Sequence, residues 1–233
     1  GKSVTRKVTI NKPKVKQQLI AFRTGSYTLD PGLNKKAYYK VLAVNYSEVR
    51  VVLYRVTIAD RENFMYGLRY NQSGKRLDNP FYKSIGHIIS DKVVQFKNVK
   101  DEPEELQIDL RPALLDQSNG FGHVVVYVEP TKKSCNSKFK YRTKLHSWVT
   151  CTHLAVDAFV SDVISGYILV TDLNSGLAVA DAEISIYSTN LKHSTAIGKS
   201  DKHGVYDFSK SNFRFSKSSM YFSAKLKTDS VIS

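Results

Sequence analysis

Short runs of apolar residues, separated by turn residues, recur along the whole chain and predict β-strands. Residues 48–56 form a β-branched, partly alternating run, and residues 106–110 alternate with a period of two. Residues 123–129 are almost continuously apolar and end at Pro130, which is typical of a buried strand. Further strands are predicted at residues 18–22, 38–44, 92–96, 148–160, 166–172, 182–187, 205–208 and 220–226.

Residues 58–70 are ambiguous, because Asp60 could cap a short helix that carries Phe64, Met65 and Leu68 on one side. No helical segments of the kind that join parallel strands are evident between the strands. Each half instead offers about five to seven short strands with frequent turns. The sequence therefore predicts an all-β fold of two tandem antiparallel β-sandwiches, of the macroglobulin, immunoglobulin or fibronectin type.

A polar and basic stretch at residues 131–143 interrupts this pattern and has the composition of a linker. We therefore predict a first β-sandwich over residues 1–142, including a basic N-terminal segment and this linker. The second sandwich is predicted over residues 143–233. A chain of 233 residues suits two domains of ordinary size, and its 42% hydrophobic content is enough for packed cores.

The chain carries a net charge of +14, much of it near the start. Residues 1–40 hold ten lysines and arginines, with Asp30 as their only acid. Such a segment could attract an acidic glycan or another anionic surface, or it could be a solvated surface that keeps edge strands from pairing. No RNA-binding aromatic motif, helix-turn-helix pattern or zinc-finger spacing accompanies the charge, so we expect no nucleic-acid partner.

Several features favour an extracellular or cell-surface protein. No apolar run is long enough for a transmembrane helix, and the first residues do not resemble a signal peptide, as expected of a mature or excised piece. Asn45 and Asn71 begin two N-glycosylation sequons. Cys135 and Cys151 form no C-x-x-C pair, and a disulfide between them would close a loop of roughly 15 residues, worth about 3 kcal/mol. We predict a secreted glycoprotein with this disulfide.

Residues that carry chemistry do not occur in recognised patterns. The six histidines show no metal-ligand spacing, and no G-x-S-x-G elbow is present. Glu102, Glu104 and Glu105 could bind calcium, but adjacent carboxylates in a connection are usually solvated. Trp148 is either a ligand-stacking residue or a plug in the core or between domains. We expect no catalytic residue, metal or cofactor, and no enzyme activity.

The second half carries an ordered set of motifs. Residues 170–187 read V-T-D-L-N-S-G-L-A-V-A-D-A-E-I-S-I-Y, and residues 198–204 read G-K-S-D-K-H-G. Preceded by Trp148, this order resembles a macroglobulin-type domain of the alpha-2-macroglobulin family, especially its bacterial-style branch. The resemblance implies turns at Gly176 and Gly204. The family's usual glycine before alanine is replaced here by Asp181, and its usual proline is replaced by the pair at residues 178–179.

The first half matches the same family more loosely. Residues 51–56 read V-V-L-Y-R-V, similar to a strand of that family, and residues 106–128 are similar to a later stretch. The resemblance covers residues 15–130 loosely and 145–233 more closely. Whole members of the family trap proteases through a bait segment, and many carry an internal thioester between Cys and Gln. Neither cysteine here has Gln three residues on.

The resemblance therefore implies a non-catalytic scaffold fragment of an alpha-2-macroglobulin-like endopeptidase inhibitor, without the bait and thioester regions. Its implied partners are proteases, through the full-length parent, and other domains of that parent. The alternative is an Ig-like stalk or adhesin segment of a cell-surface protein that binds a protein or glycan.

Overall fold

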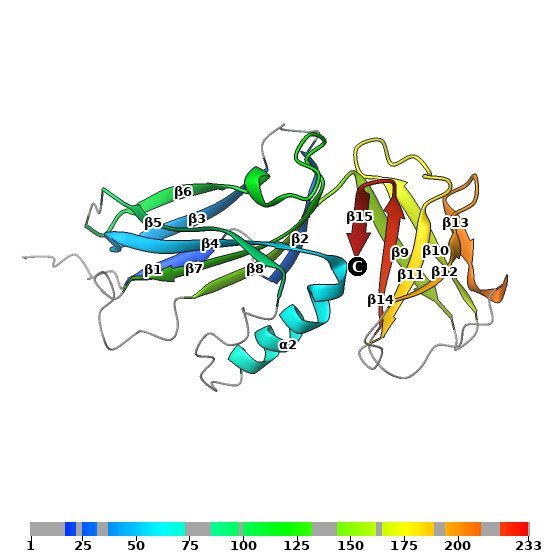
Figure 1. The fold of residues 1–233 in the computed structure, drawn as a ribbon, viewed down its shortest axis with the longest axis horizontal. Coiled ribbons are helices and arrows are strands. Elements are labelled where there is room, and N and C mark those ends of the chain that lie inside the picture. The colour runs from blue at the N-terminus through cyan, green and yellow to red at the C-terminus, as the bar shows by residue number, and fades with distance from the viewer. Residues whose placement is uncertain are drawn as a thin grey trace, which may run out of the picture.

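The computed structural model contains two β-sandwiches in tandem (Figure 1). It describes residues 17–21, 25–31, 37–72, 85–97, 100–131, 144–161, 165–188, 194–210 and 220–232. The all-β fold class predicted from the sequence is confirmed. Outside the strands lie one α-helix and three short 3-10 helices within these ranges.

The first sandwich packs a three-stranded sheet on a five-stranded sheet. The smaller sheet has the order β1 (Gln18–Ala21), β3 (Tyr38–Val44) and β6 (Pro103–Asp109). The larger has the order β2 (Gly25–Leu29), β8 (Leu145–Cys151), β7 (Gly122–Pro130), β4 (Glu48–Val56) and β5 (His87–Gln95). Alternate residues of the strands meet between the sheets, where Val41, Val51 and Val126 are fully buried. The 3-10 helix η3 (Arg111–Ala113) follows β6 and closes this core with Ala113.

One strand pair departs from the antiparallel pattern. β2 pairs with β8 in parallel, from Gly25 opposite Ser147 to Leu29 opposite Cys151. The other strand pairs of the described residues are antiparallel. A parallel pair needs a long crossover between its strands, and here the connection includes most of the first sandwich.

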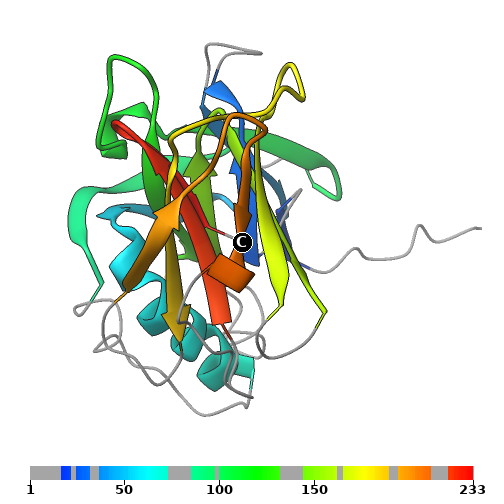
Figure 2. The ribbon, with the colours of Figure 1, turned by 90° about the vertical axis from the view of Figure 1, so that its right-hand side faces the viewer.

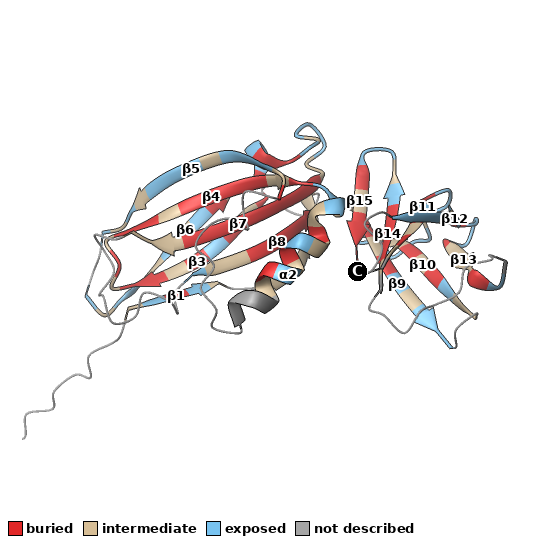
Figure 3. Cartoon of the chain, turned by 60° about the horizontal axis from the view of Figure 1, so that its bottom comes forward, coloured by how far each residue is buried: buried red, intermediate tan, exposed pale blue. Residues whose placement is uncertain are grey.

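A helix covers the outer face of the five-stranded sheet (Figure 3). It is α2 (Arg61–Gln72), and it continues directly from the 3-10 helix η1 (Ile58–Asp60). The helix considered for residues 58–70 is confirmed, since Phe64 is fully buried and Met65 and Leu68 pack against the same apolar cluster. The Asp60 carboxylate accepts hydrogen bonds from the backbone N–H groups of Thr57 (2.8 Å) and Gly86 (3.2 Å), which fixes the start of the helical segment.

The second sandwich packs a three-stranded sheet on a four-stranded sheet (Figures 1 and 2). The first has the order β13 (Val205–Asp207), β10 (Gly166–Asp172) and β9 (Leu154–Val160). The second has the order β12 (Thr195–Lys199), β11 (Glu183–Ser188), β14 (Met220–Leu226) and β15 (Asp229–Ile232). Ile168, Ile184 and Phe208, the first residue of the 3-10 helix η5 (Phe208–Lys210), are fully buried between them.

The strands correct the domain boundary expected after residue 142. β8 lies in the larger sheet of the first sandwich, paired with β7 from Gly122 opposite Cys151 to Val128 opposite Leu145. The predicted strand 148–160 is thus two strands of different sandwiches, and the chain crosses between them at Thr152 and His153. The polar stretch 131–143 connects two neighbouring strands of one sheet. The prediction was wrong here because a polar connection between two strands can have the same composition as a linker between domains.

The turns expected in the second half are confirmed. Gly176 has a φ of 68° and donates its N–H to the carbonyl of Asp172 (2.8 Å). Gly204 has a φ of 74° and donates to the carbonyl of Asp201 (2.9 Å). Asp181, which stands where the resembled family has glycine, also has a positive φ of 60°. Aspartate tolerates this left-handed conformation better than most residues, so the substitution keeps the backbone path.

Candidate functional site

The site residues proposed from the sequence lie apart from one another. Asn45 has a φ of 57°, and its amide ties the β3–β4 connection to the β5–β6 connection by donating to Asp101 Oδ1 (3.0 Å) and accepting from the Asp101 N–H (2.8 Å). Asn71 lies in α2, but its side chain is outside the described residues. Glycosylation at either position stays a prediction.

The structure gives no support to the disulfide. Cys151 ends β8 with a free, buried thiol, whose burial raises its pKa to about 12. Cys135 lies outside the described residues. The thiol of Cys151 therefore stays protonated at neutral pH, which suits a core residue and not a nucleophile.

Two of the three acidic residues considered for calcium, Glu104 and Glu105, are part of a strand, and Glu102 lies just before it. β6 begins at Pro103, Glu104 accepts the N–H of Lys97 (2.9 Å), and Glu105 pairs with Lys40 (3.1 Å). Over the residues that the structure describes, no three His, Cys, Asp or Glu side chains gather as a metal site.

Trp148 is a core residue beside the junction of the two sandwiches. Its side chain is fully buried, with ring centroids 5.6 Å from Phe64 of α2 and 5.6 Å from His123 of β7. Its indole Nε1 donates to Thr150 Oγ1 (3.2 Å). Of the two alternatives left open by the sequence, the structure favours the plug, because the ring has no face open to a ligand.

His123 links the two sandwiches through its imidazole. Nδ1 lies 3.0 Å from Thr150 Oγ1 in the first sandwich, and Nε2 lies 3.0 Å from Ser230 Oγ in the second. Burial, and to a lesser extent the charge of Arg61, lowers its pKa to about 4. The ring is therefore neutral at neutral pH and donates through one nitrogen while accepting through the other.

Two more hydrogen bonds cross the junction. The backbone N–H of His153 donates to Asp229 Oδ2 (3.0 Å), and Thr228 Oγ1 donates to Asp116 Oδ2 (2.8 Å). The His153 ring itself turns back to the first sandwich, where it contacts Asp30 Oδ1 (2.8 Å). These bonds fix an orientation and assemble no nucleophile with a base.

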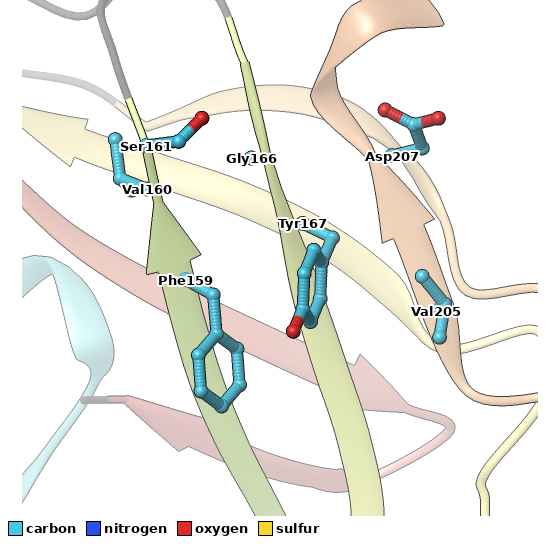
Figure 4. A pocket seen from close by; sticks show the side chains of 7 residues that line it. All are labelled: Phe159, Val160, Ser161, Gly166, Tyr167, Val205 and Asp207. Carbon is cyan, nitrogen blue, oxygen red and sulfur yellow. The ribbon is translucent and has the colours of Figure 1, made fainter.

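A surface hollow lies on the three-stranded sheet of the second sandwich (Figure 4). Phe159 of β9 and Tyr167 of β10 stack on each other with ring centroids 4.9 Å apart and planes 24° apart. They are 49% and 45% exposed. The hollow has a volume of about 510 Å³, and its remaining lining comes from Val160, Ser161, Gly166, Val205 and Asp207.

This hollow offers apolar rings, one carboxylate and one serine hydroxyl. Such a surface can receive an apolar or basic side chain of a partner, with the rings supplying contact area and Asp207 a charge. It holds no pair of groups that could transfer a proton to or from a reacting atom. We therefore regard it as a candidate contact surface. It was missed in the sequence, because the outward residues of a strand look alike whether they face solvent or a partner.

Comparisons with known proteins identify the fold. No protein-family model and no curated protein matches the sequence. Among solved structures, the chain is similar to native alpha-2-macroglobulin from Escherichia coli spanning domains NIE-MG1, with 15% identity and a TM-score of 0.64 over 94% of this chain and 97% of that one. The fold is thus that of macroglobulin-like β-sandwich domains.

Longer structures match in the same way. An Escherichia coli fragment spanning domains MG0-NIE-MG1 has 15% identity and a TM-score of 0.61, over 96% of this chain and 65% of that one. Salmonella alpha-2-macroglobulin reacted with methylamine has 14% identity and a TM-score of 0.56, over 94% of this chain. This chain spans 12% of that Salmonella protein. The structural neighbours are therefore bacterial alpha-2-macroglobulins, of which the chain resembles a part.

Proposed function

We propose that this chain is a non-catalytic scaffold fragment of an alpha-2-macroglobulin-like endopeptidase inhibitor. One observation carries the proposal: both sandwiches, in their order, match a bacterial alpha-2-macroglobulin fragment over 94% of this chain. The bait and thioester regions that act on proteases belong, in this proposal, to other parts of the full-length protein.

The chemistry of the described residues supports a scaffold role. The buried ring of His123 at the junction joins the two sandwiches through its hydrogen bonds to Thr150 and Ser230. The Cys151 thiol is buried and protonated, so it is a poor candidate for a thioester.

The exposed rings of Phe159 and Tyr167 suit contact with another domain of the same parent. The matched Escherichia coli and Salmonella structures contain more chain than this one covers, so further domains are present in those proteins. Aromatic residues are enriched at interfaces because they bury a large area at a low cost in side-chain entropy. We assign this face to a neighbouring domain.

Export is part of the same proposal. It rests on the likeness to bacterial alpha-2-macroglobulin structures. Separately, no helix in the described ranges is long and apolar enough to cross a membrane. Glycopeptide analysis of the natural protein tests Asn45 and Asn71. Thiol alkylation before and after reduction tests the pairing of Cys135 with Cys151.

The main test compares the full-length protein with the 233-residue chain in protease assays. A trapped protease loses activity on a large protein substrate and retains it on a small chromogenic peptide. We expect the full-length protein to produce this split with trypsin, and the chain alone to leave both activities unchanged at the same molar excess.

If the full-length protein spares both activities, the inhibitor proposal fails. The alternative, an Ig-like stalk or adhesin segment, would then be supported by further Ig-like repeats or a surface anchor in the parent.

A further inference from the structure

Arg61 is a buried arginine for which the described residues supply no counter-ion. It is the first residue of α2 and is only 7% exposed. Its Nε and Nη1 atoms are fully buried and have no hydrogen-bond partner. The start of α2 lies beside β15 of the second sandwich (Figures 1 and 3). Arg61 also interacts electrostatically with Tyr221 of β14, in the second sandwich.

The arginine is held by an aromatic ring instead of an acid. The guanidinium carbon lies 5.3 Å from the centre of the Trp148 ring. By contrast, Arg50 pairs with Asp91 and Glu129, and Arg111 pairs with Asp109. Arg61 therefore differs from these two arginines in having a cation–π contact but no carboxylate.

The titratable groups that interact with Arg61 do not neutralise it. They are His123, which burial keeps neutral, and Tyr221 of the second sandwich. The buried carboxylate of Asp229 lies at the same junction and accepts the N–H of His153 through Oδ2. Its Oδ1 is also buried without a partner, so the two unpaired groups do not satisfy each other.

An unpaired buried guanidinium is costly for physical reasons. Burial lowers the pKa of Arg61. An arginine nevertheless keeps its proton in proteins, so it cannot escape the cost by becoming neutral. A stacked tryptophan offsets part of the lost hydration but leaves the N–H donors unfilled. An anion offsets the rest, and the planar guanidinium matches a carboxylate best.

We propose that Arg61 anchors an anion site at the junction of the two sandwiches, and that its ligand is a carboxylate. The carboxylate comes either from a small free acid or from an acidic side chain elsewhere in the full-length protein. Since Tyr221 and Trp148 approach the guanidinium from different sandwiches, a bound carboxylate also stabilises their relative orientation. The proposal does not depend on protease inhibition.

The chain contains its own reporter, because Trp148 is its sole tryptophan and stacks on the guanidinium. We would titrate the 233-residue chain with sodium acetate, holding ionic strength constant with sodium chloride, and record tryptophan fluorescence and the thermal midpoint Tm. The variants are Arg61→Met, which keeps the packing on Trp148, and Arg61→Gln, which keeps a polar head. The control is Arg111→Met, which removes an exposed, paired arginine.

If small carboxylates fill the site, acetate gives a saturable fluorescence change and a higher Tm in the unaltered chain and in the Arg111→Met control. Neither position 61 variant responds. In acetate-free buffer, Arg61→Met raises the Tm of the chain, because it removes an unpaired buried charge.

The second source is tested in the full-length protein, by hydrogen exchange of the α2 amides. If an acidic side chain of the parent fills the site, Arg61→Met lowers the hydrogen-exchange protection of α2 in the full-length protein but raises the Tm of the isolated chain. Acetate then changes neither the protection of α2 in the full-length protein nor the order in which the variants rank there.

Two results overturn the proposal. One is that Arg61→Met lowers the Tm of the isolated chain in acetate-free buffer, which would show that the charge is already satisfied. The other is that acetate has no effect on the chain and Arg61→Met raises stability in both contexts.

Discussion

The two sandwiches treat the outer faces of their sheets in opposite ways. In the first, α2 covers the five-stranded sheet and buries Phe64 against Trp148. In the second, the outer face of the three-stranded sheet is bare, and Phe159 and Tyr167 lie half-exposed on it. Both faces carry aromatic pairs, but among the residues that the structure describes only the first face is covered by another element.

The difference separates residues that stabilise the chain from residues that are available to contact a partner. Burying a large side chain contributes free energy to folding in proportion to the apolar area removed from water. The covered face contributes this free energy to the folding of the chain, whereas the exposed face would contribute it only on binding a partner. Four predictions follow this contrast from large effects to small.

Truncation at the covered face should be the most damaging. Phe64→Ala leaves a cavity beneath α2 and should lower the free energy of unfolding by about 3–5 kcal/mol. Urea denaturation followed by Trp148 fluorescence measures it. Tyr66→Ala, on the same helix at a residue 64% exposed, is the control and should cost less than about 0.5 kcal/mol. Equal losses of unfolding free energy in the two variants would contradict the packing of Phe64 between α2 and the sheet.

Acid should weaken the same region through His123. Its pKa is lowered to about 4 in the folded chain, against an ordinary unfolded value of about 6.5. Between these values His123 is protonated in the unfolded state and neutral in the folded state. Stability is therefore lost as the pH falls from about 6.5 to about 4. The loss should approach roughly 3 kcal/mol.

His123→Gln removes this titration while keeping a side-chain amide for Thr150 and Ser230. Unfolding measured by denaturant at each pH should then depend less steeply on pH in that window. An unchanged slope in the variant would assign the dependence to another group.

The turn before β13, in the same three-stranded sheet, leaves no room for a side chain at Gly204. An alanine Cβ at Gly204 would meet the carbonyl oxygen of Val170 at 2.4 Å, in addition to the strain of φ at 74°. Gly204→Ala should therefore cost about 2–3 kcal/mol. Gly176→Ala is the matched control, because its φ is 68° and nothing lies within 4 Å, so about 1 kcal/mol is expected. Thermal unfolding of the two variants should rank them in this order, and a reversed order would contradict the placement of β13.

The outer side of that sheet should be the most tolerant. Phe159→Ala removes half-exposed area and one stacking contact, so the isolated chain should lose about 1 kcal/mol or less. In the full-length protein the same change should reduce hydrogen-exchange protection along β9 and β10, because the proposed neighbouring domain covers them. Leu177→Ala, an exposed residue outside the hollow, is the control. Equal hydrogen-exchange protection of β9 and β10 in the full-length protein and its Phe159→Ala variant would contradict the proposed contact with a neighbouring domain.

Local pattern was enough to predict much of the fold. The period-two alternation and β-branched runs predicted β4, β6 and β7, and the spacing of Phe64, Met65 and Leu68 indicated the helix. The turns at Gly176 and Gly204 could also be predicted, because positions with a positive φ favour glycine. These features depend on neighbours close in the sequence.

The errors concern relationships between distant parts of the chain. Thr152 and His153, where the chain changes sandwich, include neither glycine nor proline, so residues 148–160 look like one strand. The parallel pairing of β2 with β8 joins segments more than a hundred residues apart. Nothing in the sequence around Arg61 distinguishes it from an exposed arginine, since its burial is imposed by the sheet and by the second sandwich.

The crossing at Thr152 and His153 has a mechanical consequence. Only these two residues separate β8 from β9, and their N–H groups are tied to the carbonyl of Leu29 (3.0 Å) and to Asp229 Oδ2 (3.0 Å). A flexible linker would extend under tension before transmitting it. Here a pull on the second sandwich passes along β9 into β8, which is clamped by ladders to β7 and β2 and is loaded in shear. We therefore expect the short connection to transmit force between the two sandwiches directly, without a slack segment to be stretched first.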